Sequence, residues 1–388
     1  MKLAESEEVG ILREMVRSFL AKEAPPEKVA EWDEADLIPR EIIKKLGDLG
    51  LCGLVVPEEY GGMGHDVLGL VAVLEELSAH MMGLGGLFVM NAGYGSLNVS
   101  NLGSDAQKEK LLPGLLAGET LFAYGLSEPD VGADLTSVTT KARRDGDRII
   151  INGTKRWCSG ADIADYIYAL VQSGPPEDRR KNLSFVLIPT DAPGVSMTRT
   201  ETMGSRGTAT NDVNFDDVVL SIDDVMGGEA GWNQGWSMLG GPSLEVEKLV
   251  TPSLAVGVAR AALDEAWEYA QVRKQGGKHI AGHQAVRHVL AQAQTDLLSC
   301  QLMLQHSARL VEAGQPSAVE TSMAKLYISE VAKNIVLNCQ QYVMGAYGYA
   351  KGFNMERYVR DILVFPIFGG STAIQRNNVA NLLKLPRE

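Results

Sequence analysis

The chain has 388 residues, of which 45% are hydrophobic and 22% are charged; this is ordinary for a globular protein and long enough for two or three domains or one composite unit. Its net charge of −13 argues against a general nucleic-acid-binding protein, which needs excess lysine and arginine to neutralise phosphates. The charge does not exclude an anionic ligand, because a local basic pocket can oppose the global field.

The cysteines and the N-terminal segment further limit the class of protein that this chain can be. Four cysteines, at positions 52, 158, 300 and 339, have no C-x-x-C spacing, so no metal site and no disulfide framework are indicated. The segment MKLAESEEVGILREMVRSFL carries charges throughout, unlike a signal peptide. No apolar run approaches the length of a transmembrane helix. We therefore expect a cytoplasmic protein with no nucleic-acid or membrane partner.

Residues 1–120 are predicted to form a helical domain. Apolar residues recur at helical spacing over 11–20, 42–51, 67–80 and 106–117. The glycine-rich run 83–86 lies between helices and predicts a bend. Because no G-x-G-x-x-G opens a strand-to-helix turn, a Rossmann dinucleotide domain is not expected.

The sequence pattern changes from helical to strand-like over residues 121–235. Short runs rich in β-branched and aromatic residues, separated by Gly, Pro and Asp, predict strands over 148–153, 166–171, 183–188 and 213–219. This indicates a β domain that forms a small barrel or sandwich. Helical periodicity returns over 236–388, with predicted helices at 243–275, 283–313, 317–346 and 371–384, and a four-helix bundle is the natural packing for such lengths.

Two segments of the β domain combine an aromatic residue with small hydroxyl residues. The first is Tyr124-Gly125-Leu126-Ser127-Glu128-Pro129-Asp130-Val131-Gly132-Ala133-Asp134, and the second is Asn152-Gly153-Thr154-Lys155-Arg156-Trp157-Cys158-Ser159-Gly160. A flat aromatic face beside hydroxyls suits a planar, hydrogen-bonding cofactor. The alternative is a structural β-turn with a core tryptophan. In order and content, the pair resembles the flavin-cradling segments of the acyl-CoA dehydrogenase family.

The resemblance extends over nearly the whole chain, and it implies an FAD site. Ser127 takes the place of the family's usual threonine, Gly132 keeps its place, and Ala133 replaces a serine that bonds the flavin phosphate. Trp157 corresponds to the tryptophan beside the ring and Ser159 to the hydroxyl near N5. The resemblance also assigns Tyr124 and Leu126 to the cofactor.

A second group of cofactor residues is implied in the C-terminal domain. Arg273 resembles the arginine that reaches the flavin pyrophosphate of a neighbouring subunit, a role that suits its bidentate guanidinium, and Gln284 follows it. Gly276 replaces the usual phenylalanine, and the alternative is a solvated helix end. Gly345 and Ala346 resemble the family's glycine-rich turn at the adenosine, although Tyr342 departs from the usual glutamine and a plain helix-ending turn is the alternative.

The segment Phe368–Arg376 resembles the family's Y-E-G-T-x-Q-I-Q-R box, which assigns Ser371 and Ala373 to the cofactor, with Ala373 replacing a glutamine. Gly369 stands where many members carry the catalytic glutamate. Isovaleryl-CoA dehydrogenase and some relatives also lack that glutamate and take the base from an L-x-x-E-[RK] motif. Here Leu244–Lys248 provides the motif, and Glu247 is the matching position. The alternatives are a solvent-facing glutamate and a dead enzyme.

The resemblance and the chemistry support one another. Oxidising a thioester removes an α-proton and a β-hydride, and a carboxylate in an apolar cleft has a raised pKa and can act as the base. The enolate-like oxygen needs fixed donors, and Gly369 retains its backbone N–H. Glu245 lies roughly 200° around the helix from Glu247 and cannot share its face.

We therefore expect the acyl-CoA dehydrogenase fold and FAD-dependent α,β-dehydrogenation of an acyl thioester. Expected partners are acyl-CoA or an acyl-carrier thioester, an electron-transfer flavoprotein and further copies in a homotetramer. The alternatives are a carrier-protein-linked dehydrogenase, an enoyl-thioester reductase, a flavin monooxygenase on this fold and a non-catalytic flavin-binding protein.

Overall fold

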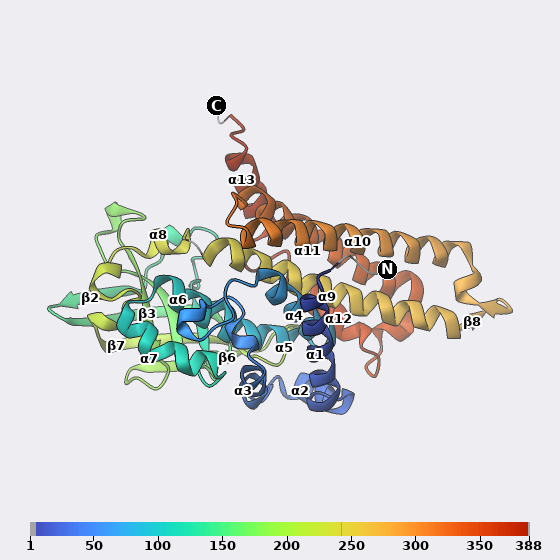
Figure 1. The fold of residues 1–388 in the computed structure, drawn as a ribbon, viewed down its shortest axis with the longest axis horizontal. Coiled ribbons are helices and arrows are strands. Elements are labelled where there is room, and N and C mark those ends of the chain that lie inside the picture. The colour runs from blue at the N-terminus through green and yellow to red at the C-terminus, as the bar shows by residue number, and fades with distance from the viewer. Residues whose placement is uncertain (1–4, 242, 387–388) are drawn as a thin grey trace.

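The computed structural model describes residues 5–241 and 243–386. A β region lies at one end of the long axis, the long helices extend to the other end, and the N-terminal helices pack beneath them (Figure 1). One hydrophobic cluster runs through all three regions. The three regions therefore share one core. In it, α4 (Val67–His80) of the N-terminal region packs along α9 (Ser243–Val272) of the C-terminal region.

The N-terminal region is helical, as predicted. It contains α1 (Glu7–Glu23), α2 (Pro26–Ala35), α3 (Glu41–Asp48), α4, α5 (Met82–Phe88), a π-helix η3 (Val89–Leu97), α6 (Asn98–Leu102) and α7 (Asp105–Leu116). Ser6 caps α1 by accepting a hydrogen bond from the Val9 N–H, and Ser104 and Gln107 form a capping box on α7.

The predicted bend at residues 83–86 is wrong, because these residues form most of α5. A Cβ on Gly85 would lie 2.3 Å from Leu254 Cδ2 of α9, and a Cβ on Gly83 would lie 2.2 Å from the Arg206 carbonyl oxygen. The glycines allow α5 to pack against its neighbours at close range. This packing outweighs the low helix propensity of glycine.

The β region is one sheet of seven strands. They are β1 (Phe122–Gly125), β2 (Lys141–Asp145), β3 (Arg148–Ser159), β4 (Tyr166–Gln172), β5 (Leu183–Pro189), β6 (Val195–Thr200) and β7 (Thr210–Ser221). The group β1–β4–β5 meets the group β2–β3–β7–β6 at one pair, Lys141 with Gln172. Within the described chain no ladder joins β6 back to β1 or β5.

The C-terminal region follows a short helix, α8 (Gly235–Leu239). Its long helices are α9, α10 (Gln284–Glu312) and α11 (Ala318–Asn338), which continues as a π-helix η9 (Cys339–Met344); α12 (Met355–Ile362) and α13 (Thr372–Leu382) complete it. The helix predicted over 243–275 ends at Val272. A small hairpin of β8 (Lys274–Gln275) and β9 (Lys278–His279) follows, because Gly276 and Gly277 adopt positive φ.

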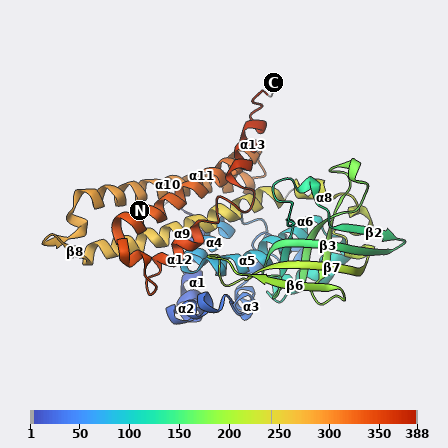
Figure 2. The same ribbon diagram turned by 180° about the vertical axis from the view of Figure 1, so that it is seen from behind.

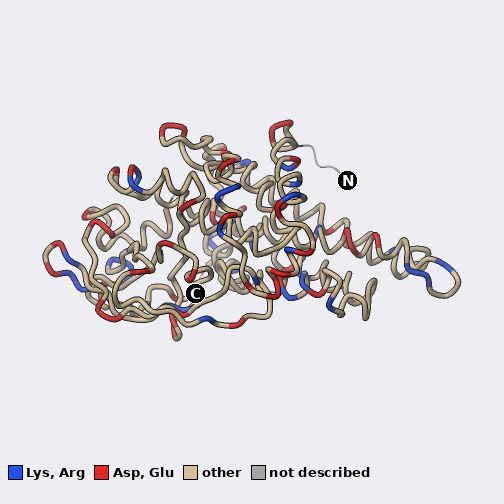
Figure 3. The backbone as a smooth tube through the Cα atoms, turned by 90° about the horizontal axis from the view of Figure 1, so that it is seen from below, with Lys and Arg blue, Asp and Glu red and all other residues tan. Residues whose placement is uncertain are grey.

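Two parts of this region project from the body. The β8–β9 hairpin lies at the end of the molecule opposite the sheet, and α13 stands away from the bundle (Figures 1 and 2). Lysine and arginine mark the tip of the hairpin (Figure 3). The hairpin is thus at the opposite end of the molecule from the strand β3, which carries Trp157.

Candidate active site

Glu247 lies in the second turn of α9 and faces the sheet. Its Oε1 accepts a hydrogen bond from the Tyr124 hydroxyl at 2.5 Å and another from Asn98 Nδ2 at 2.8 Å. Within the described chain no hydrogen bond is made by Oε2. One oxygen is thus held by two donors, and the other is free to take a proton.

Burial raises the pKa of the Glu247 carboxyl, and the hydrogen bonds from Tyr124 and Asn98 oppose this by stabilising the carboxylate. Glu247 itself is half-buried, and it lines a small hollow together with Tyr168, Met238 and Leu239. A raised pKa makes a carboxylate a stronger base, and this suits proton abstraction near neutral pH.

The predicted separation of Glu245 from Glu247 is confirmed. Glu245 turns to the other side of α9, where it pairs with Lys248 at 3.0 Å and accepts a hydrogen bond from Thr321 of α11. It ties two helices of the bundle together and has no contact with the Glu247 cleft.

Both donors to Glu247 depend on features that the sequence patterns did not reveal. Asn98 begins α6 directly after the π-helix η3, and Tyr94 of η3 stacks on Tyr124 with ring centroids 3.9 Å apart and an interplanar angle of 14°. π-helical turns are rare and are often found at functional sites. Here the Tyr94 ring of the π-helix packs on Tyr124, and the amide of Asn98, which directly follows the π-helix, donates to Glu247.

Gly369 lies beside Thr251 of α9, the helix that carries Glu247. A Cβ built on it would lie 2.7 Å from Thr251 Oγ1, and Thr251 is one helical turn beyond Glu247. Its φ of 61° is left-handed, a conformation that favours glycine. Its N–H makes no hydrogen bond to any described residue, so it is available to a ligand.

A buried ion pair between Lys155 of β3 and Glu128 anchors the loop that follows β1. Lys155 Nζ lies 2.8 Å from Glu128 Oε1, and the two side chains are 0% and 3% exposed. Glu128 also accepts hydrogen bonds from Thr139 and from the Thr140 N–H. These partners lower the pKa of Glu128 to about 2, although burial alone would raise it. Neither residue of the pair was recognised as functional from the sequence.

The two predicted flavin segments lie side by side. The Arg156 N–H donates to the Ser127 carbonyl oxygen at 2.8 Å. The pairing of β3 with β7 shifts register between Lys155 and Cys158, and Trp157 within this bulge has φ of 62°. A bulge re-aims a side chain, and Trp157 is 53% exposed. The alternative of a core tryptophan is therefore wrong.

Several of the remaining predicted cofactor residues are exposed. Ser159 is exposed, and its Oγ lies 3.2 Å from Thr210 Oγ1. Gly132 and Ala133 are exposed, and a Cβ on Gly132 would have no atom within 4 Å. Ser371 caps α13 through the Ile374 N–H, and Ala373 is exposed on the first turn.

The second predicted group lies at the far end of the molecule. Arg273 packs over the Tyr347 ring at 5.1 Å, beside the turn that contains Gly345 and Ala346. Gln284 begins α10 just after the hairpin, and it is exposed. The β8–β9 hairpin that follows Arg273 lies at the end of the molecule opposite β3 (Figure 1). The expectation that Arg273 acts across a subunit interface stays a prediction.

Comparison with known proteins gives one consistent result. The chain matches the acyl-CoA dehydrogenase N-terminal domain over residues 6–119, the middle domain over 123–218 and the C-terminal domain over 233–384. It belongs to the acyl-CoA dehydrogenase family. The predicted family and fold, with helical terminal domains around a central β domain, are thereby confirmed.

Individual relatives cover the whole chain. A 3-(aryl)acrylate reductase of Clostridium sporogenes is 34% identical over 98% of this chain and 99% of its own length. The "Caffeyl-CoA reductase-Etf complex subunit CarC" of Acetobacterium woodii is 33% identical over 97% and 98%. The crystal structure of an acyl-CoA dehydrogenase from Geobacillus kaustophilus superposes with a TM-score of 0.93 at 28% identity, covering 99% of this chain and 100% of that one.

Acyl-CoA dehydrogenases are FAD-dependent flavoproteins, and the residues of this chain fit the cofactor. An exposed aromatic ring held in strained backbone beside the Ser159 hydroxyl is unexplained by packing, whereas a flavin ring would cover it. The open space at Gly132 leaves the loop backbone accessible. Ala133 has no hydroxyl, so the side-chain bond that the usual serine supplies is missing here.

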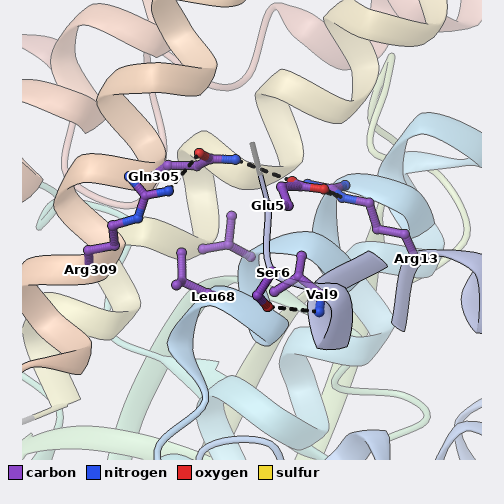
Figure 4. A pocket seen from close by; sticks show the side chains of 8 residues that line it. Glu5, Ser6, Val9, Arg13, Leu68, Gln305 and Arg309 are labelled. Atoms are coloured by element: carbon purple, nitrogen blue, oxygen red, sulfur yellow. Dashed lines mark hydrogen bonds and ion pairs between the residues drawn. The ribbon is translucent and has the colours of Figure 1, made fainter. Parts of the chain in front are cut away.

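A second hollow lies apart from the Glu247 site. A hollow between α1, α4 and α10 is lined by Glu5, Ser6, Val9, Arg13, Leu68, Val71, Gln305 and Arg309 (Figure 4). Its polar groups already bind one another, because Glu5 accepts from both Arg13 and Gln305. Over residues 5–241 and 243–386 no cluster of side chains suited to a metal ion is found, and no helix there is long and apolar enough to cross a membrane.

Proposed function

We propose that the chain interconverts a saturated acyl thioester and its α,β-unsaturated counterpart, with Glu247 as the base. The observation that carries the proposal is the carboxylate of Glu247. It is held through Oε1 by two donors and has a free Oε2, and Gly369, whose N–H is unpaired among the described residues, lies beside Thr251, one turn further along α9.

Each residue has a defined part in this reaction. Glu247 Oε2 takes the α-proton, and the thioester carbonyl oxygen accepts a hydrogen bond from the Gly369 N–H, which stabilises the enolate-like charge. FAD, when bound, supplies the acceptor for the β-hydride. Tyr124 and Asn98 hold the base in place and keep its charged form accessible.

The cofactor would lie on the exposed face of the β region. Trp157 and Ser159 would hold the ring, and the loop from Leu126 to Ala133, with the Ser127 hydroxyl as a donor, would bind along it. Ser371 and Ala373 at the start of α13 would contribute from the C-terminal region. Arg273 with Gln284, Gly345 and Ala346 would serve a neighbouring copy in an oligomer, since the β8–β9 hairpin beside Arg273 lies at the end of the molecule opposite β3 (Figure 2).

A second candidate is the reverse reaction. Two relatives with over 30% identity are named as reductases, and one of them belongs to a complex with an Etf. This supports an electron-transfer flavoprotein as partner and an enoyl thioester as substrate. In that direction the protonated Glu247 returns the α-proton. Turnover of an enoyl thioester with reduced flavin, compared with bleaching by the saturated form, distinguishes the two directions.

The test is a pair of glutamate variants on one helix. Glu247→Gln keeps the shape but cannot accept a proton, and loss of a general base typically lowers the rate by about 10²–10⁴. Glu245→Gln, on the other side of α9, is the matched control and should retain activity. Anaerobic flavin bleaching is followed with straight, branched and cyclic acyl-CoAs. Wild-type bleaching rates in Glu247→Gln would place the base elsewhere.

A further inference from the structure

The hollow beside Glu247 contains a buried hydroxyl that has no partner. Tyr168 of β4 is 1% exposed, and its Oη makes no hydrogen bond to any residue that the structure describes. Tyr168 lines the same hollow as Glu247, and the charge of Glu247 acts on its hydroxyl. Nearly all buried polar side-chain atoms are paired, so an unpaired hydroxyl beside a base indicates a missing ligand group.

The walls around this hydroxyl are aromatic. The Tyr168 ring stacks on Phe185 at 4.3 Å with an interplanar angle of 21°, and it lies 5.4 Å from the Tyr124 ring. Tyr124 is in turn stacked on Tyr94. Tyr94, Tyr124, Tyr168 and Phe185 therefore form a row of four rings, in which Tyr124 bonds the proposed base and its neighbour Tyr168 carries the unpaired hydroxyl. Flat rings favour offset or edge contacts with another ring.

The opposite wall is apolar and adaptable. Met238 and Leu239 of α8 line the hollow with Leu244, and two glycines, Gly240 and Gly241, follow the five-residue helix. As it stands, the hollow has no volume for a water molecule, so a trapped water does not satisfy Tyr168. A ligand must displace Met238 and Leu239, and methionine side chains adapt readily to such changes.

We propose that Tyr168 selects an acyl group with a planar ring near the reacting carbons and a hydrogen-bonding substituent on that ring. The proposal rests on the proposed function, because it places the reacting carbons at Glu247. The ring would lie along the wall of Tyr124, Tyr168 and Phe185, and the substituent would exchange a hydrogen bond with Tyr168 Oη. A site with few polar groups in an apolar lining derives its specificity from those groups.

The experiment compares two matched ring substrates on the FAD-loaded enzyme. Flavin bleaching is measured anaerobically with 3-phenylpropanoyl-CoA, 3-(4-hydroxyphenyl)propanoyl-CoA and hexanoyl-CoA. Dissociation constants of the two corresponding ring enoyl-CoA products are measured by titration, as a readout independent of turnover. The variants are Tyr168→Phe and, as control, Tyr166→Phe. Tyr166 lies two residues away on β4 and packs against Phe122, outside the hollow.

We expect the wild type and Tyr166→Phe to prefer the hydroxylated ring over the plain ring by about two- to tenfold in kcat/KM and in Kd. Tyr168→Phe should abolish this preference, and its Tm should not fall, because the change removes an unpaired buried hydroxyl. Equal use of both rings by the wild type would overturn the proposal, as would an unchanged preference in Tyr168→Phe. Bleaching by hexanoyl-CoA alone would overturn it while leaving the proposed function intact, whereas no bleaching by any thioester would refute the proposed function itself.

Discussion

Replacing Tyr124 by phenylalanine tests how the protein sets the strength of its base. The Tyr124 hydroxyl donates to Glu247 Oε1 at 2.5 Å, and Asn98 remains as a second donor after the change. A hydrogen bond to a charged group is worth about 1.5–3 kcal/mol, and one pKa unit corresponds to about 1.4 kcal/mol, so the pKa of Glu247 should rise by about 1 to 2 units.

The direction of the expected pH shift follows from the proposed role of Glu247 as the base. Glu247 must be deprotonated to take the α-proton, so dehydrogenation falls as the pH drops through its pKa. This pKa is already raised by burial, and loss of the tyrosine donor raises it further. The acid limb of the kcat/KM profile should therefore move about 1 to 2 units toward higher pH in Tyr124→Phe, and activity should recover at alkaline pH.

The assay is the pH profile of anaerobic flavin reduction, with FAD content measured at each pH. Tyr166→Phe serves as the control, because Tyr166 is a partly exposed tyrosine of the adjacent strand with no contact to Glu247. An acid limb at the same pH in Tyr124→Phe and the wild type would refute the reasoning. A uniform loss of rate at every pH would also refute it, since that would mean only misplacement of the carboxylate.

Three further predictions concern the surroundings of the site. Lys155→Met should lower the free energy of unfolding by about 3–5 kcal/mol in chemical denaturation, because it leaves the buried partner carboxylate uncompensated. Arg273→Ala should weaken FAD retention about ten- to a hundredfold by equilibrium dialysis and loosen the oligomer in sedimentation, whereas Lys274→Ala should do neither. Adding Gly369→Glu to Glu247→Gln should not restore flavin bleaching, because the backbone at 369 is left-handed and its Cβ direction is occupied.

The sequence was sufficient for the large helices and for the different directions in which Glu245 and Glu247 leave α9, whereas the assignment of Glu247 as the base stays a prediction. The long apolar periodicity of α9 and α10 needs no tertiary information, and the angle between residues 245 and 247 on a helix is fixed by geometry. The four-residue strand β1 is too short for its pattern to be detected, and β2 and β6 were missed because they are mostly exposed. β2 has one buried residue, Ala142, and β6 has none, so a search for apolar runs cannot detect them.

The parts of the site that escaped prediction all depend on contacts between distant segments. Asn98 is 149 positions from Glu247, and nothing local in the π-helix marks it as a partner of a carboxylate. The ion pair of Lys155 and Glu128 joins residues that are 27 positions apart. One signal was available: a lysine within an alternating strand at a buried position requires a partner.

The position of the base follows from the space around Gly369. Residue 369 has positive φ, and its Cβ would lie 2.7 Å from Thr251 Oγ1. A glutamate there would need both a strained backbone and movement of Thr251. The cleft already receives a carboxylate from Glu247, one turn earlier on the same helix. The backbone N–H of Gly369 remains unpaired among the described residues, so the loss of the side chain removes no donor for the thioester oxygen. The absence of a glutamate at 369 therefore supports the proposed base on α9 and is not by itself a sign that the catalytic function is lost.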